Sequence, residues 1–167
     1  IGLYEKAMRN TLTWKEKLQC AKECGYDYLE ISIDATEEKI NRIYMDTEEK
    51  REIMEAIFDT GIPIGSMSVS ALTKYALGDP DQAVRDRGME IAEKSIQLSS
   101  ALGVRTVMIP GYDIYYGEST IETKRYFLEN IRKIAEIAER EGILVGFETM
   151  ENNFMNTTGK AVQYVNM

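Results

Sequence analysis

Short apolar runs alternate with long amphipathic segments along the chain. Five runs are rich in strand-forming residues, and they cover Ile1–Glu5, Tyr28–Ile33, Ile62–Met67, Val104–Ile109 and Ile143–Phe147. Four of the five are mainly apolar, as expected of parallel strands buried on both faces. The segments between them carry apolar residues at helical spacing, for instance Met89, Ala92 and Ile96. The pattern therefore predicts alternating strands and helices.

Helix start and stop signals punctuate this pattern. Four pairs match the capping box, in which a cap side chain and the third helical residue bond to each other's free amides. These pairs are Thr13 with Glu16, Asp46 with Glu49, Asp79 with Gln82 (with Pro80 in the first turn), and Ser119 with Glu122. Glycines that end helices stand just before strands, at Gly25, Gly61, Gly103 and Gly142, with spacings of 36, 42 and 39 residues. The repeated unit is one strand and one helix.

Repeated βα units leave two architectures, the doubly wound sheet and the (β/α)8 barrel. Neither GxGxxG nor GxxxxGK(S/T) occurs in the sequence, which favours the barrel. Residues 156–165 predict one more helix after the fifth strand. We therefore predict a single α/β domain, residues 1–167, that forms the N-terminal five-eighths of a TIM barrel of parallel strands, with strands six to eight absent. The first and fifth strands are then expected to be unpaired edges.

Charge and composition exclude several partners. The chain has 20 Lys and Arg against 28 Asp and Glu, a net charge of −8, so phosphate backbones repel it and nucleic acid is not expected as a partner. No apolar run reaches the roughly 18 residues of a membrane helix, so no membrane partner is expected and we predict a cytoplasmic protein. Cys20 and Cys24, four residues apart on a predicted helix, are expected to be reduced thiols.

The chain contains no histidine. It therefore supplies no Ser-His-Asp or Cys-His arrangement, no imidazole base and no imidazole metal ligand, which leaves carboxylates, Lys, Tyr and Cys for chemistry. In a barrel the reacting groups occupy the carboxyl ends of the strands. The polar residues at these positions are Tyr4, Glu5, Lys6, Glu30, Ser32, Asp34, Ser66, Ser68, Ser70, Tyr112, Asp113, Tyr115, Tyr116 and Glu148. We expect Glu5, Glu30, Ser68, Glu148 and Asp113 or its neighbours to converge at one end of the sheet.

Glu148 stands out among these residues because it ends an apolar strand, Ile143–Phe147. A carboxylate in such a setting needs a cation, a metal ion or several donors to remain charged. Two interpretations follow. One is an ion pair with Lys or Arg from a neighbouring strand, and the other is a ligand for a hard metal ion that also exchanges a proton with substrate.

Several segments together resemble the L-ribulose-5-phosphate 3-epimerases, also called L-xylulose-5-phosphate 3-epimerases, which belong to the xylose-isomerase-like barrels. The matching segments are Ile1–Ala7, Gly25–Asp34, Leu77–Gly78, Val84–Arg85, Gly88, Gly111–Tyr116, Glu148 and Met155–Asn156. The resemblance covers the whole chain, and the order and spacing of the segments make it more specific than any one motif. One departure lies after the third strand, where Leu72 and Thr73 replace a His and an Arg of the family pattern and Lys74 keeps one cation.

The resemblance implies an epimerase that inverts C3 of a 2-ketopentose 5-phosphate through a metal-stabilised enediolate. It implies that Glu148 is a ligand of a divalent metal ion (Mn, Mg or Zn) and one of two catalytic acid-base residues. The other ligands, an Asp, a His and a second Glu, are implied on strands six to eight. Lys6, Glu30 and Tyr112 are nominated by position as contacts to the sugar or its phosphate. The partner is then a small sugar phosphate, and a homo-oligomer is left open.

Two other interpretations remain. A related isomerase or epimerase of the same superfamily would act on an unphosphorylated or six-carbon sugar, and an endonuclease with this barrel is disfavoured by the net charge of −8. From a different class, the 167-residue chain alone would be a scaffold fragment or a binding module, because it lacks three of the four implied ligands. An Asp, a His and a Glu at successive strand ends beyond Met167 would support the enzyme.

Overall fold

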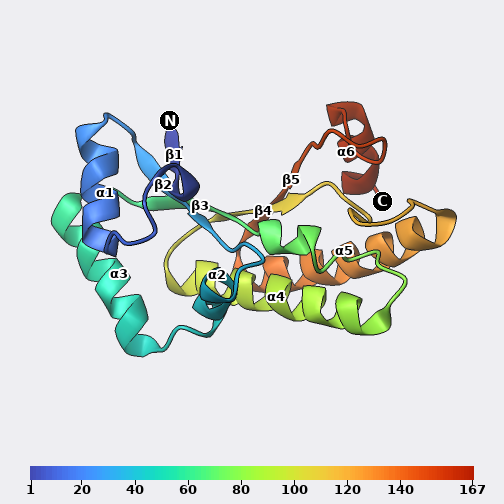
Figure 1. Cartoon of the computed structure of the whole chain (residues 1–167), viewed down its shortest axis with the longest axis horizontal. Coiled ribbons are helices and arrows are strands. Elements are labelled where there is room, and N and C mark those ends of the chain that lie inside the picture. The colour runs from blue at the N-terminus through green and yellow to red at the C-terminus, as the bar shows by residue number, and fades with distance from the viewer.

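The computed structural model describes residues 1–167 as an alternation of strands and helices (Figure 1). The strands are β1 (Gly2–Tyr4), β2 (Tyr28–Ser32), β3 (Ile64–Ser68), β4 (Thr106–Pro110) and β5 (Leu144–Glu148). The α-helices are α1 (Trp14–Glu23), α2 (Glu37–Asn41), α3 (Thr47–Thr60), α4 (Gln82–Ala101), α5 (Ile121–Glu141) and α6 (Thr158–Val165). Short 3-10 turns are η1 (Glu5–Ala7), η2 (Arg42–Tyr44) and η3 (Ser70–Thr73). None of the helices is both long and apolar enough to cross a membrane.

The five strands form one parallel sheet in the order β1-β2-β3-β4-β5. This confirms the predicted architecture, because each helix returns the chain to a neighbouring parallel strand. The edge strands β1 and β5 each have one hydrogen-bonded neighbour, so the sheet is open, as predicted for five strands of an eight-stranded barrel. All five carboxyl ends consequently lie at the same edge of the sheet.

Some of the predicted helix caps are confirmed, and others lie one or two residues away from the predicted position. Thr13 and Asp46 form capping boxes with Glu16 and Glu49, as predicted. The predicted cap at Asp79 is wrong: α4 begins two residues later with Asp81 as its cap, and the Asp79 carboxylate accepts the Asp81 amide instead. The four glycines predicted to end helices, Gly25, Gly61, Gly103 and Gly142, all adopt the left-handed conformation.

The cap of α5 also lies one residue beyond its predicted position. Thr120 forms the capping box with Thr123, and the predicted cap, Ser119, donates its hydroxyl to Asp113 at 2.7 Å. Cys20 and Cys24 are unpaired thiols, as expected.

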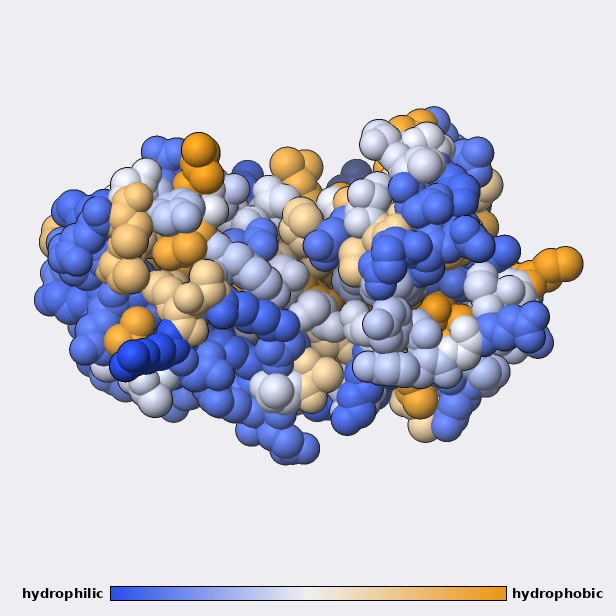
Figure 2. Space-filling view, turned by 45° about the horizontal axis from the view of Figure 1, so that its top comes forward, coloured by the Kyte–Doolittle hydropathy of each residue, from blue (hydrophilic) through white to orange (hydrophobic).

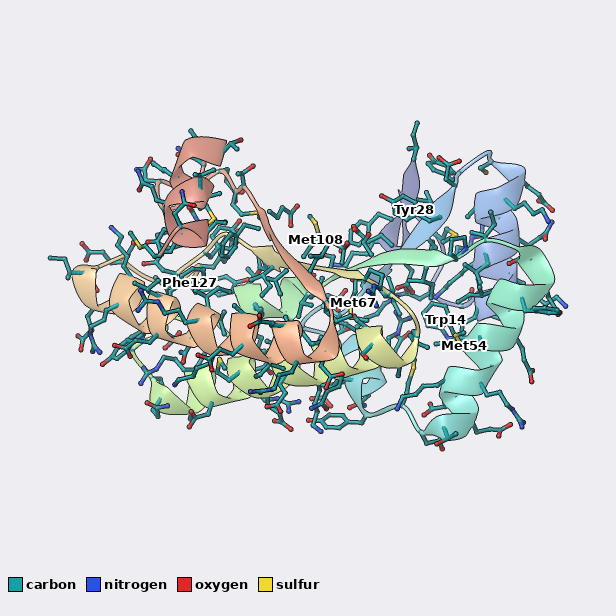
Figure 3. The ribbon with its side chains drawn as sticks, turned by 180° about the vertical axis from the view of Figure 1, so that it is seen from behind. Trp14, Tyr28, Met54, Met67, Met108 and Phe127 are labelled. Atoms are coloured by element: carbon teal, nitrogen blue, oxygen red, sulfur yellow. The ribbon has the colours of Figure 1, made fainter.

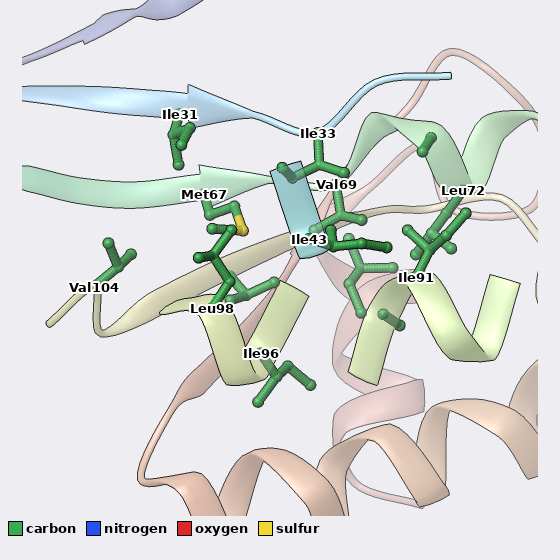
Figure 4. Close-up of a cluster of buried hydrophobic side chains, with 14 of the residues drawn as sticks. Ile31, Ile33, Ile43, Met67, Val69, Leu72, Ile91, Ile96, Leu98 and Val104 are labelled. Carbon is green, nitrogen blue, oxygen red and sulfur yellow. The ribbon is translucent and has the colours of Figure 1, made fainter. Parts of the chain in front are cut away.

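The main core lies between the sheet and the helices on one of its faces (Figure 4). Alternate strand residues enter it, among them Ile31 of β2 and Met67 of β3. From the helix side come Ile91, Ile96 and Leu98 of α4. α1 packs beside α3, and α4 beside α5, so that the long helices cover this face of the sheet (Figure 1). The opposite face carries no helix over its middle.

Glu5 is the centre of a buried ionic cluster directly after β1. Its carboxylate accepts hydrogen bonds from Lys17 at 2.7 Å, Lys39 at 2.6 Å and Arg42 at 2.6 and 2.8 Å, and from the backbone amide of Ser32 at 3.0 Å. Only 1% of Glu5 is exposed. Burial alone would raise the pKa of Glu5, but the hydrogen bonds and charges of Arg42, Lys17 and Lys39 hold it far below its ordinary value. The cluster ties the end of β1 to β2 and to three helical elements, α1, α2 and η2.

Candidate functional site

The face of the sheet away from α4 and α5, which we call the open face, carries the polar side chains of the strands. Since side chains alternate along a strand, Leu29 and Ile31 enter the core while Glu30 lies on the open face. Tyr28 and Met108 lie on this face too, whereas Met67 points toward α4 (Figure 3). The surface is hollowed there, between the part of the molecule that carries β1 and the part that carries α6 (Figure 2).

Glu148 ends β5 on the open face. Its neighbour Phe147 points the other way, toward Phe127 of α5, with ring centroids 6.1 Å apart. No ion pair includes Glu148, so the salt-bridge interpretation does not hold within this chain. Although the residue is exposed, partial burial of its carboxylate raises the pKa of Glu148, and the negative charges of Glu30 and Glu151 raise it further.

Glu30 lies on β2, two strand positions before the sheet's carboxyl edge. Its carboxylate accepts a hydrogen bond from Ser66 of β3 at 2.5 Å, and Ser66 is its cross-strand partner. The pair fixes the carboxylate on the open face, where its charge acts on Glu148. The structure therefore brings these two sequence-nominated carboxylates into one electrostatic group.

Lys6 lies in η1, at the β1 side of the same edge. Its ammonium is 3.2 Å from the Asp34 carboxylate and 3.4 Å from the Ser70 hydroxyl. Burial lowers the pKa of Lys6, but the hydrogen bond and charge of Asp34 outweigh that effect and raise it. Lys6 is thus a fixed cation at the rim, with two-fifths of its side chain exposed.

Tyr112 follows β4 and is 4% exposed. Its hydroxyl donates to the Glu151 carboxylate, with distances of 3.0 and 3.1 Å to the two oxygens. Burial and the neighbouring Glu151 raise the pKa of Tyr112 well above its usual range, so the phenol remains a donor. Glu151 therefore connects the two residues: it accepts the Tyr112 hydroxyl, and its charge acts on Glu148. The sequence analysis did not identify Glu151 as a candidate.

Other strand-end residues do not face the opening. Glu5 is turned into the ionic cluster, and Asp113 is fully buried, where it accepts the hydroxyls of Ser119 and Thr123 at 2.7 Å each. Glu5 lies at the predicted end of the sheet, but its side chain is not available on the open face because Lys17, Lys39 and Arg42 bind it in the buried cluster. Leu72 is 2% exposed and lies in the core, so that position presents no side chain to the opening.

A cavity of about 350 Å³ is lined by Asp113 and Asn152, the residues that follow Tyr112 and Glu151 in the sequence. It lies between the loop after β4 and the loop after β5, and its wall combines amides, charges and aromatic rings. The lining residues are Asp113, Ile114, Tyr115, Gly117, Ser119, Lys124, Asn152, Asn153 and Phe154. A volume of this size is sufficient for a small polar molecule.

The donor set on the open face fits a divalent metal ion only in part. Glu148 fits as one ligand, because its carboxylate has no cationic partner and the carboxylates of Glu30 and Glu151 add negative charge near it. No group of three or more His, Cys, Asp or Glu side chains in the structure is placed to hold a metal ion. The chain therefore does not by itself form a complete metal site.

Comparison with known proteins shows which family has this fold. Residues 18–167 match the family model described as the xylose isomerase-like TIM barrel. The L-ribulose-5-phosphate 3-epimerase UlaE of Escherichia coli O139:H28 (strain E24377A / ETEC) is 38% identical over 164 residues, which are 98% of this chain and 58% of the relative. The chain thus spans less than two thirds of the length of the curated relative it matches. The resemblance inferred from the sequence is confirmed.

Solved structures share the fold at low sequence identity. A D-psicose 3-epimerase, crystallised in the presence of D-fructose, superposes with a TM-score of 0.81 at 19% identity, over 99% of this chain and 58% of that one. An L-ribulose 3-epimerase superposes with a TM-score of 0.77 at 21% identity, over 99% of this chain and 56% of that one. These structures support the partial barrel described above.

Proposed function

Because the chain belongs to the xylose isomerase-like TIM barrel family, we propose that it is the N-terminal part of a metal-dependent 3-epimerase. Its substrate is a 2-ketopentose 5-phosphate, L-ribulose 5-phosphate or L-xylulose 5-phosphate. The observation that carries the proposal is the 38% identity to an L-ribulose-5-phosphate 3-epimerase across 98% of the chain. The position of Glu148 on the open face supports it, since an epimerase needs a carboxylate there that can reach substrate.

Inversion at C3 requires one group to remove the proton and another to return a proton to the opposite face of the same carbon. We assign one of these tasks to the Glu148 carboxylate, whose burial and carboxylate neighbours make it a stronger proton acceptor. The second carboxylate belongs to polypeptide outside these 167 residues. A divalent cation, when bound, supplies positive charge that stabilises the enediolate. Glu148 would be one of its ligands.

The remaining residues bind and orient substrate in this proposal. Glu30, fixed by Ser66, is an acceptor for a sugar hydroxyl on the open face. Lys6 is a cation at the rim that pairs with an anionic or hydroxyl group of the substrate. A related epimerase acting on another sugar stays the alternative, as does a scaffold role for the chain.

Product analysis tests this function. The full-length protein, purified with added Mn²⁺, Mg²⁺ or Zn²⁺, is expected to convert L-ribulose 5-phosphate to L-xylulose 5-phosphate, with a higher kcat/KM than for L-ribulose or D-fructose. A chelator should stop turnover and a divalent ion should restore it. A preference for an unphosphorylated sugar would favour the alternative substrate class, and the absence of turnover with all three sugars would support the scaffold.

A further inference from the structure

A tyrosine and a glutamate link the two loops that flank Glu148. The Tyr112 hydroxyl, from the loop after β4, bonds to both oxygens of Glu151, from the loop after β5. The Tyr112 ring is held in turn by Tyr115, edge to face at 4.8 Å between centroids. Glu151 itself is exposed and takes part in no ion pair. Its carboxylate is therefore free to accept further hydrogen bonds, and the bond from Tyr112 fixes its orientation.

The backbone around this pair is tightly held. The Gly111 amide donates to the Glu148 carbonyl at 2.9 Å, and a Cβ at Gly111 would lie 2.7 Å from that carbonyl oxygen and 2.9 Å from Met155. Asn152 organises the loop after β5 by accepting the amides of Phe154 at 2.9 Å and Met155 at 3.1 Å. Consequently the hydrogen bonds of Asn152 and of the Glu148 carbonyl give the loop that carries Glu151 a defined shape.

We infer that Glu151 is a substrate-binding residue, which accepts hydrogen bonds from hydroxyl groups of the sugar, and that Tyr112 is the positioning residue that orients it. This inference rests on the proposed function. An ionised carboxylate has about four acceptor sites, and one hydroxyl donor from Tyr112 leaves most of them free for the donors of a polyol. Bonds to a charged acceptor are stronger than neutral ones, so the pair affects affinity and the choice among sugar epimers.

The chain offers a matched control for this pair. Tyr126 donates its hydroxyl to Glu122 at 2.8 Å on the surface of α5, which is the same chemistry away from the open face. If the Tyr112–Glu151 bond serves only to hold the structure, its loss should resemble loss of the control bond. If it orients a substrate acceptor, only the Tyr112–Glu151 variants should change substrate binding.

The test compares Tyr112→Phe, Glu151→Gln and the double variant with Tyr126→Phe and Glu122→Gln in the full-length protein, by steady-state kinetics with L-ribulose 5-phosphate. We expect Glu151→Gln to raise KM about 10-fold, as for loss of a hydrogen bond to a charged group, with a smaller change in kcat. Tyr112→Phe should raise KM in the same direction. The double variant should match Glu151→Gln, because the two residues act as one unit.

The control variants should keep wild-type KM and kcat. Normal turnover with an unchanged KM in Glu151→Gln would overturn this inference and leave the proposed function standing. So would a rise in KM of equal size in Glu122→Gln. Absence of both turnover and ketose-phosphate binding in the wild-type protein would overturn the proposed function, and this inference with it.

Discussion

Replacing Glu148 with Gln in the full-length protein is expected to lower kcat for C3 epimerisation by at least about 10²- to 10⁴-fold, the range for loss of one general base. Gln keeps the shape of the side chain but removes its charge and basicity, and weakening of the metal site adds to the loss. The measurement is kcat at saturating substrate and divalent metal ion, beside a Glu139→Gln control on the exposed surface of α5.

Near-normal turnover in Glu148→Gln would contradict the role assigned to this residue. The carboxylate of Glu148 lies at the β5 end of the open face, whereas its backbone carbonyl accepts the Gly111 amide. The backbone bond survives the substitution, so a loss of turnover without a loss of folding reports on the carboxylate itself.

Glu5→Gln is expected to destabilise the folded protein by about 3–5 kcal/mol, the cost of removing one partner from a buried ionic group. Lys17, Lys39 and Arg42 would then remain buried beside a neutral amide. The measurement is the free energy of unfolding of the full-length protein from urea titration. Glu48→Gln is the control, because its ion pair with Arg51 lies on the surface and is worth about 0–1 kcal/mol.

A cost for Glu5→Gln of less than about 1 kcal/mol would show that the cluster does not stabilise the fold. The cluster matters for the site as well as for stability, since Glu5 precedes Lys6 in η1 and accepts the Ser32 amide at the end of β2. Its loss would loosen the β1 side of the open face.

The fold was predictable because its signals are local. Four of the five predicted strand runs are mainly apolar, and the helix-ending glycines adopt the left-handed conformation at the predicted residues. The errors in boundaries have local causes too. Strand β3 starts at Ile64, two residues later than predicted, after Pro63, which has no amide hydrogen to donate to the sheet. The α4 boundary moved because the Arg85 guanidinium donates to the carbonyls of Asp79 and Pro80 and holds them in a turn.

The candidate site was only partly predictable. Glu148 carried its own signal, a carboxylate at the end of an apolar strand. The direction of the Glu5 side chain depends on three cations that lie 12, 34 and 37 residues away in sequence, so no local pattern reveals it. Glu151 could have been noticed as a second acidic residue in the loop after β5, but its pairing with Tyr112 spans 39 residues and needs the sheet register.

Solvent isotope incorporation tests the central claim most directly, because proton removal at C3 exchanges that hydrogen with solvent. The full-length protein, given L-ribulose 5-phosphate and a divalent metal ion in D₂O, should yield L-xylulose 5-phosphate that carries deuterium at C3. NMR of the product reads the position. The account predicts deuterium at C3 in the wild-type product and its loss in Glu148→Gln, whereas epimerised product that retains its original C3 hydrogen would contradict it.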